Sequence, residues 1–191
     1  MLSETSRAAH IRVGGGVERA RYDRVAISLH WATVILVLVQ FGTSQLWGFA
    51  ARPTRHVMIV SHMSFGILLG VIVIARLIWR FVPGHQVRPT DRGLTEALAQ
   101  SVHFLLYALL VAQTALGVYL RWAGGEAMSF FGFALPSPFT AISKEAQKFI
   151  GELHYWVGWA IIVIAFGHAL AALYHHFVLR DGVLKRMLPA A

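Results

Sequence analysis

The chain has 191 residues, of which 57% are hydrophobic and only 14% are charged, whereas an average soluble domain carries about 25% charged residues. This composition is typical of a membrane protein. The sequence contains no cysteine, which excludes disulfides, cysteine-ligated iron–sulfur clusters and a haem attached covalently through cysteine. Any metal or redox group must therefore be held by histidine, carboxylate or thioether side chains.

Four apolar stretches each reach the ~20 residues that a helix needs to cross the hydrocarbon core of a membrane. They cover approximately residues 25–49, 56–81, 95–122 and 149–179. We predict an all-α integral membrane protein whose four transmembrane helices form a bundle over residues 25–180. A flexible tail of residues 1–24 precedes the bundle and a second tail, residues 181–191, follows it. The first tail does not have the short basic start and apolar run of a cleavable signal.

The basic residues are distributed unequally between the two sides of the predicted membrane. Twelve of the 17 Lys and Arg residues flank the spans on the side of the two termini, and five flank them on the other side. The positive-inside rule therefore predicts that both termini are cytoplasmic. Because these residues flank spans and do not gather on one soluble face, the net charge of +8 does not indicate nucleic-acid binding.

The longest connection between spans, residues 123–147, is rich in aromatic residues. We expect it to form a surface lid at the membrane interface, anchored by Phe130, Phe131 and Phe133. No internal repeat or low-complexity run is apparent in the sequence.

Four histidines fall within the predicted spans at depths that form two pairs. His154 and His168 lie fourteen residues apart on one helix, which places them about 21 Å apart on nearly the same face. With the N-terminus inside, His30 lies level with His168 and His62 lies level with His154. Two imidazoles that face each other beside small residues suit a b-type haem with two axial histidines. Spacing alone also allows a histidine proton relay, a transporter, or simple packing.

Three segments carry a resemblance to a known family: "RYDRVAISLHW", "VSHMSFGILLGVIVIARLIWR" and "LHYWVGWAIIVIAFGHALAALYHHFVLRDGVLKRMLP". Together with the four-span plan, they make the chain similar to the bacterial cytochrome b561 family over approximately residues 21–189. The resemblance implies a multi-pass inner-membrane protein with two non-covalent haem b groups. It also implies that His30 and His168 ligate the iron of the inner haem, and that His62 and His154 ligate the iron of the outer haem.

An iron with two histidine ligands has no open coordination site, so the expected chemistry is electron transfer between separate donors and acceptors. A quinone, most simply ubiquinone, is the expected lipid-soluble partner. We predict that His103 and His175 contact the quinone ring near the inner haem, because imidazole titrates near neutral pH. We predict that Arg76 contacts a haem propionate or the quinone.

The resemblance favours superoxide as the donor at the outer face, which would make the chain a superoxide:ubiquinone oxidoreductase. An excess of cations around the outer mouth would attract such an anion. An alternative is a cytochrome b membrane subunit that passes electrons from a periplasmic hydrogenase or dehydrogenase to quinone, with the partner protein docked on residues 123–147. A third hypothesis is a haem-free proton relay or transporter that uses the same histidines.

Overall fold

The computed structural model describes residues 12–13, 16–17, 21–83 and 93–188 of the chain. Most of the predicted N-terminal tail and the end of the predicted C-terminal tail lie outside the described residues. Two short strands, β1 (Arg12–Val13) and β2 (Gly16–Val17), pair in an antiparallel manner.

Four long helices confirm the predicted four-helix fold. They are α1 (Arg24–Leu46), extended by the 3₁₀ turn η1 (Trp47–Phe49), α2 (Arg52–Phe81), α3 (Leu94–Ala123) and α4 (Lys144–Tyr174), extended by the π-helical turn η2 (His175–Leu179). Each of these four helices is long and apolar enough to cross a membrane.

Two helices begin earlier than the hydropathy pattern predicts. α2 begins at Arg52 instead of near residue 56, and α4 begins at Lys144 instead of near residue 149. Ser143 caps α4, because its side chain accepts a hydrogen bond from the backbone N–H of Ala146 at 3.3 Å. Hydropathy detects only the part of a helix that lies in lipid, so it misses polar first turns of this kind.

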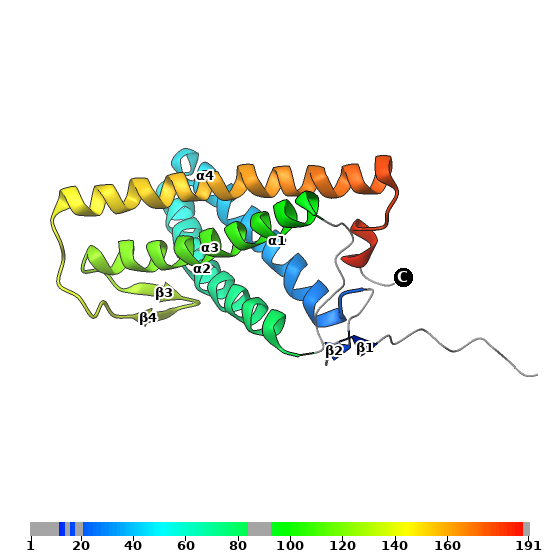
Figure 1. The fold of residues 1–191 in the computed structure, drawn as a ribbon. Helices are drawn as coiled ribbons and strands as arrows, with labels where there is room; N and C mark the ends of the chain where they lie inside the picture. The colour runs from blue at the N-terminus through cyan, green and yellow to red at the C-terminus, as the bar shows by residue number, and fades with distance from the viewer. Residues whose placement is uncertain (1–11, 14–15, 18–20, 84–92, 189–191) are drawn as a thin grey trace, which may run out of the picture.

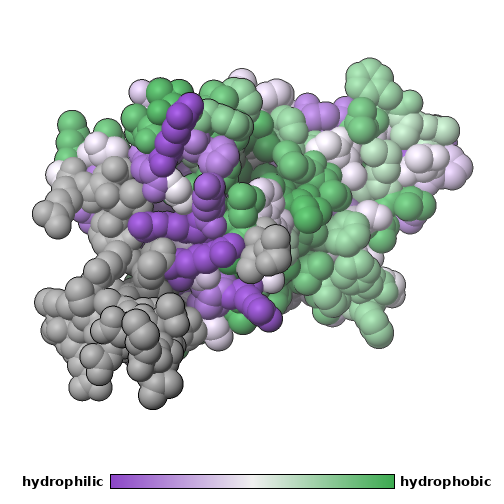
Figure 2. Space-filling model, turned by 90° about the vertical axis from the view of Figure 1, so that its right-hand side faces the viewer, coloured by the Kyte–Doolittle hydropathy of each residue, from purple (hydrophilic) through white to green (hydrophobic). Residues whose placement is uncertain are grey.

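The helices form two hairpins, α1–α2 and α3–α4, which meet where α2 packs against α3 (Figure 1). α1 and α3 begin at one end of the bundle, and α2 and α4 finish there; we call this the termini end. The opposite end carries η1 and a β-hairpin, and we call it the loop end. Figure 2 faces the termini end, where hydrophilic side chains gather beside apolar ones. Exposed cations at this end include Arg24, Arg80, Arg180 and Lys185.

The bundle has a small buried core, formed by Leu69 and Val73 of α2, Leu110 of α3 and Ile161 of α4. Many other large apolar side chains point away from the bundle; Leu38, for example, is 62% exposed. An apolar surface of this extent is expected where a helix faces lipid and is unusual on a protein in water.

The predicted lid at the loop end is a β-hairpin. Strand β3 (Met128–Phe130) pairs antiparallel with β4 (Phe133–Leu135), and the two residues between them, Phe131 and Gly132, both have positive φ angles, 45° and 93°. Two successive positive φ angles are typical of the tight turns that join paired strands. A left-handed conformation is unfavourable for phenylalanine, so other contacts must hold Phe131 in place.

Contacts with α2 hold this turn. The backbone N–H of Phe131 donates to the buried Oγ of Ser64 at 2.9 Å, and the ring of Phe131 lies 5.5 Å from that of Phe65, centroid to centroid. Phe133 is 72% exposed on the outer side of the hairpin. Of the predicted anchors, Phe131 therefore packs on the bundle, whereas Phe133 faces outward.

At the termini end, the segment after α4 turns back to the start of α1. It contains the 3₁₀ turn η3 (Leu184–Arg186). The indole Nε1 of Trp31 donates to the carbonyl of Met187 at 2.9 Å, and Arg21 donates to the carbonyl of Leu188. These bonds tie the described part of the C-terminal segment to the first hairpin.

Candidate functional site

Two predicted site residues, His62 of α2 and His154 of α4, face each other at the loop end. Their ring centroids lie 6.4 Å apart and their planes are inclined by 77°. Two imidazoles that share one metal ion need a centroid separation of about 6 Å, since each metal–nitrogen bond is about 2 Å long and the ring centre lies about 1 Å further. We call this pair the loop-end site.

Hydrogen bonding within each hairpin leaves one nitrogen of each of these rings for a metal. The Oγ1 of Thr43 donates to the carbonyl of Val39 at 2.8 Å and lies 3.4 Å from Nδ1 of His62. Because the hydroxyl hydrogen is used there, the Thr43 oxygen can accept from the Nδ1–H tautomer of His62, in which Nε2 carries a lone pair. In His154, Nε2 lies 3.3 Å from Nε2 of Gln113, whereas Nδ1 is buried without a partner. Ligands of bound metals are commonly oriented by such second contacts.

The surroundings of the loop-end site have the shape that these two rings require. A Cβ atom on Gly117 would lie 3.0 Å from Cε1 of His154, so glycine provides the space for that ring. On the other side, the Trp47 ring of η1 lies edge-on to His62, with 5.1 Å between centroids. Arg55 fixes η1 by donating from Nε to the carbonyl oxygen of Trp47 at 3.0 Å.

Four other partly buried site residues form a second cluster at the termini end, to which each helix contributes one residue: His30, Arg76, His103 and His168. Nη2 of Arg76 donates to Nδ1 of His30 at 3.1 Å. The rings of His103 and His168 lie 5.2 Å apart, centroid to centroid. His30 interacts electrostatically with both His168 and His103. We call these four residues the termini-end site.

The termini-end site contains more imidazoles than one haem needs. His168 is in ring contact with His103, while His30, its predicted partner, contacts Arg76. The guanidinium of Arg76 also lies 5.2 Å from the ring centre of Tyr107, in a cation–π contact. The residue types at both ends are therefore ones that can ligate haem iron, with one imidazole and one cation to spare at the termini end.

Comparison with known proteins identifies the family of this chain. The family model of the prokaryotic cytochrome b561 matches residues 21–190. The chain belongs to the prokaryotic cytochrome b561 family. Membership confirms the resemblance seen in the sequence and implies a multi-pass membrane protein that binds b-type haem and transfers electrons.

Individual relatives cover almost the whole chain. Cytochrome b561 homolog 2 of Escherichia coli K12 is 33% identical over 173 residues, which cover 88% of this chain and 91% of the relative. Cytochrome b561 homolog 1 of the same organism is 31% identical, and the alignment covers 88% of this chain and 97% of the relative. A probable superoxide oxidase, CybB of Yersinia pestis, is 29% identical, and the alignment covers 88% of this chain and 96% of the relative.

The predicted quinone residue His175 begins the π-helical turn η2. Its Nδ1 contacts the carboxylate of Asp181, and the other carboxylate oxygen accepts the N–H of Val183 at 3.1 Å. Partial burial opposes ionisation of Asp181, but the bonds from His175 and Val183 outweigh it and lower the pKa of this carboxyl. His175 is therefore held by the segment that follows α4.

Sequence reasoning did not select several polar residues that touch the sites: Thr43, Gln40, Gln113, Tyr107 and Asp181. The first three are polar side chains within apolar spans, which is a signal that the sequence does carry. Which histidine each of them contacts depends on how the helices are rotated, and this was not visible from spacing.

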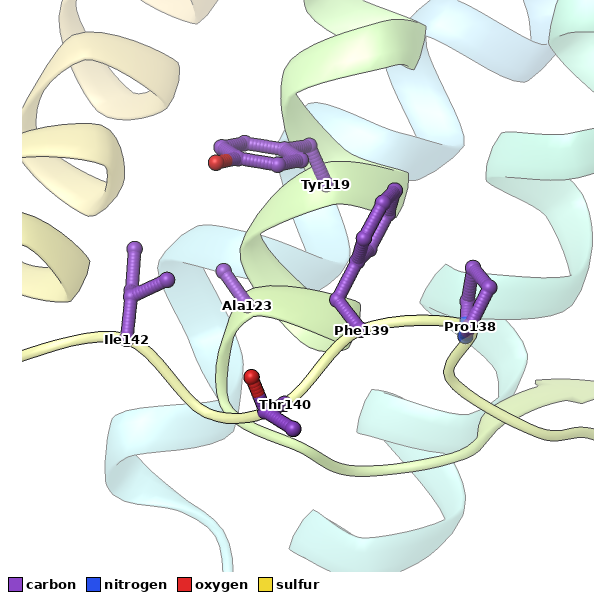
Figure 3. A pocket seen from close by; sticks show the side chains of 6 residues that line it. All are labelled: Tyr119, Ala123, Pro138, Phe139, Thr140 and Ile142. Carbon is purple, nitrogen blue, oxygen red and sulfur yellow. The ribbon is translucent and has the colours of Figure 1, made fainter.

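A shallow groove at the loop end lies beside α3, where the rings of Tyr119 and Phe139 are 6.1 Å apart (Figure 3). It is lined by Tyr119, Ala123, Pro138, Phe139, Thr140 and Ile142. The lining contains no histidine or charged side chain, so we assign no chemistry to it.

Proposed function

We propose that the chain is a di-haem cytochrome b that transfers single electrons across the bacterial inner membrane, from superoxide at the outer face to ubiquinone at the inner face. The presence of two separate histidine sites, one near each end of a four-helix bundle with spans long enough to cross a membrane, carries this proposal. The loop end faces outward, and both termini are cytoplasmic.

Within this proposal, His62 and His154 hold one haem iron, and His30 and His168 hold the other. A bound haem supplies reversible one-electron exchange at the iron. The protein fixes the four imidazoles, surrounds them with apolar helices, and leaves both substrates to bind at separate places on its surface.

Superoxide as the donor is supported by the charge of the loop end and by the probable superoxide oxidase among the relatives. Arg52 and Lys144 are exposed at this end, and cations of this kind attract a small anion. In the balanced reaction, two superoxide ions are oxidised to two molecules of dioxygen. The two electrons released, with two protons taken from the cytoplasm, reduce one ubiquinone to ubiquinol.

The termini end supplies the groups that a quinone needs. His103 and His175 are the proposed proton carriers, since imidazole titrates near neutral pH. Asp181 holds His175 from the aqueous side, and Arg76 is the proposed cation beside the quinone oxygen or a haem propionate.

The first experiment is a reduced-minus-oxidised visible spectrum and a haem-to-protein ratio for the purified protein, with the variants His62→Ala and His168→Ala. We expect two low-spin b haems per chain, one of which is lost in each variant, followed by superoxide-driven reduction of ubiquinone by the wild type. Retention of both haems in either variant would reject the ligand assignment. A colourless wild-type protein would favour the haem-free histidine relay.

The exposed aromatic residues of the loop end support a second candidate function, the membrane subunit of a periplasmic hydrogenase or dehydrogenase. Phe49 is 90% exposed, Phe133 is 72% exposed and Phe139 is 51% exposed, and such residues are enriched where proteins dock. Co-purification of a periplasmic redox protein, abolished by Phe133→Ser, would favour this function over oxidation of superoxide.

A further inference from the structure

The two helical hairpins carry the same polar residues at the same spacings. In both α1 and α3 a histidine precedes a glutamine by ten residues, and in both α2 and α4 a histidine precedes a glycine by four residues. The matched residues are His30 and Gln40 with His103 and Gln113, and His62 and Gly66 with His154 and Gly158. The two hairpins therefore share a short pattern of polar residues.

Each glutamine lies against the glycine of its own hairpin and contacts that hairpin's site histidine, Gln40 at the backbone carbonyl and Gln113 at the ring. A Cβ atom on Gly66 would lie 2.9 Å from Nε2 of Gln40, and one on Gly158 would lie 3.1 Å from Nε2 of Gln113. The amide of Gln40 donates to the carbonyl of His62 at 2.9 Å, as the amide of Gln113 contacts the ring of its own hairpin's site histidine. Each amide thus fills the space between the glycine and the site histidine of its hairpin.

Both amides leave the same atom without a partner. The Oε1 atoms of Gln40 and Gln113 are buried and accept no hydrogen bond from the described residues. An unsatisfied buried amide oxygen is unfavourable, and here it occurs twice at matched positions. A group that carries positive charge between the two hairpins would offset it.

We propose that Gln40 and Gln113 are a matched pair of positioning residues for the loop-end haem. This inference rests on the proposed di-haem function. Each amide fixes the site histidine of its own hairpin. The two buried amide dipoles also stabilise the oxidised haem, which carries one more positive charge than the reduced haem.

The repeat is incomplete at the termini end, where His30 matches His103 but Arg76 and His168 differ. Fourteen residues after His62 the first hairpin has Arg76, whereas fourteen residues after His154 the second hairpin has His168. The effect of the glutamines is therefore expected at one haem only, the one that His62→Ala removes.

The test is a redox titration of both haems in the full-length protein, with the variants Gln40→Leu and Gln113→Leu. We expect each variant to raise the midpoint potential of the loop-end haem, because an apolar side chain disfavours the charged oxidised state, and to alter its low-spin electron paramagnetic resonance signal. The other haem keeps its potential. Gln45→Leu, at an exposed position of α1, is the matched control.

A second pair of variants keeps both glutamines but displaces their side-chain amides. Gly66→Ala and Gly158→Ala each place a methyl group against the amide, so we expect them to shift the potential of the same haem. Gly42→Ala is the control, since nothing lies within 4 Å of its added Cβ. If the leucine variants lose haem, the glycine variants still show whether the glutamine amides influence the potential of the loop-end haem.

The measurements distinguish a failure of the proposed di-haem function from a failure of the inference about the glutamines. Fewer than two haems in the wild type would overturn both the proposed function and this inference. Two haems whose potentials are unmoved by the glutamine and glycine variants, or moved equally, would overturn the inference alone.

Discussion

The two ends of the bundle differ in symmetry. At the loop end, both hairpins contribute a histidine, a glycine and a glutamine to one site. At the termini end, the same register brings Arg76 from one hairpin and His168 from the other, next to two further imidazoles. A symmetric site is suited to holding one cofactor between equivalent partners, whereas the asymmetric site has groups left over for a second ligand.

The partners of the histidines differ in the same way. At the loop end they are neutral: the hydroxyl of Thr43 and the amides of Gln40 and Gln113. At the termini end they include a guanidinium and a further histidine. Neutral hydroxyls and amides do not exchange protons near pH 7, whereas imidazole does. Reduction of a quinone consumes protons, and this difference is why we propose the termini end as the quinone site.

The largest expected effect is the difference in haem content between the alanine variants of His30 and His103. We predict that His30→Ala lowers the haem content from two per chain to one, because it removes a proposed axial ligand. His103→Ala should keep both haems and slow quinone reduction by about 100-fold, the usual contribution of a proton-transfer group. Haem content and quinone reduction are measured in parallel, with His56→Ala, at an exposed position of α2, as the control.

The opposite result would change the assignment of haem ligands at the termini-end site. If His103→Ala loses a haem and His30→Ala keeps both, the ring pair at 5.2 Å would be the ligand pair, and His30 with Arg76 would face the quinone.

The next effect concerns Arg76. Arg76→Gln removes a buried cation beside His30, and a cation favours the reduced haem because the reduced state carries less positive charge. We therefore predict a lower midpoint potential for the termini-end haem in a redox titration, and little change in Arg76→Lys. Arg80→Gln, at an exposed position near the end of α2, is the matched control. A shift confined to the loop-end haem would contradict the assignment of the two sites.

A smaller effect is expected at the β-hairpin. Ser64→Ala removes the acceptor of the Phe131 N–H and should destabilise the hairpin by about 1–3 kcal/mol, the usual cost of an unsatisfied buried donor. Faster proteolysis between β3 and β4, with both haem potentials retained, is the expected result. Ser101→Ala, on the exposed face of α3, should change nothing. Unchanged proteolysis in the Ser64 variant would mean that packing of the Phe131 ring alone holds the turn.

The smallest effect is the pH dependence of the segment after α4. The pKa of Asp181 is lowered in the folded protein from an ordinary value of 3.8, so its bonds stabilise the fold above that pH and are lost as the pH falls through the lowered pKa. Hydrogen-exchange protection of the Val183 amide should therefore decline below about pH 4 in the wild type. Asp181→Asn should show lower protection at neutral pH and no such decline; equal protection in both proteins would show that the carboxylate is not needed there.

Much of the molecule followed from the sequence. Runs of apolar residues long enough to span a membrane determined the four helices, because unpaired backbone groups are too costly in lipid for any open structure. The spacing of His154 and His168 determined that there are two sites, since fourteen helical residues separate them by most of the thickness of a membrane. Membership of the prokaryotic cytochrome b561 family was also visible in the motifs of the first, second and fourth helices.

Periodicity along one helix does not predict how that helix is rotated about its axis or which side chains meet across the bundle. The tertiary structure decided both. Ser64 accepts a hydrogen bond from the hairpin turn sixty-seven residues away, and the ring of His168 contacts that of His103. The matched contacts of Gln40 and Gln113 likewise became visible only when two hairpins packed together. A helix repeat fixes depth along one axis, whereas contacts between helices depend on packing in three dimensions.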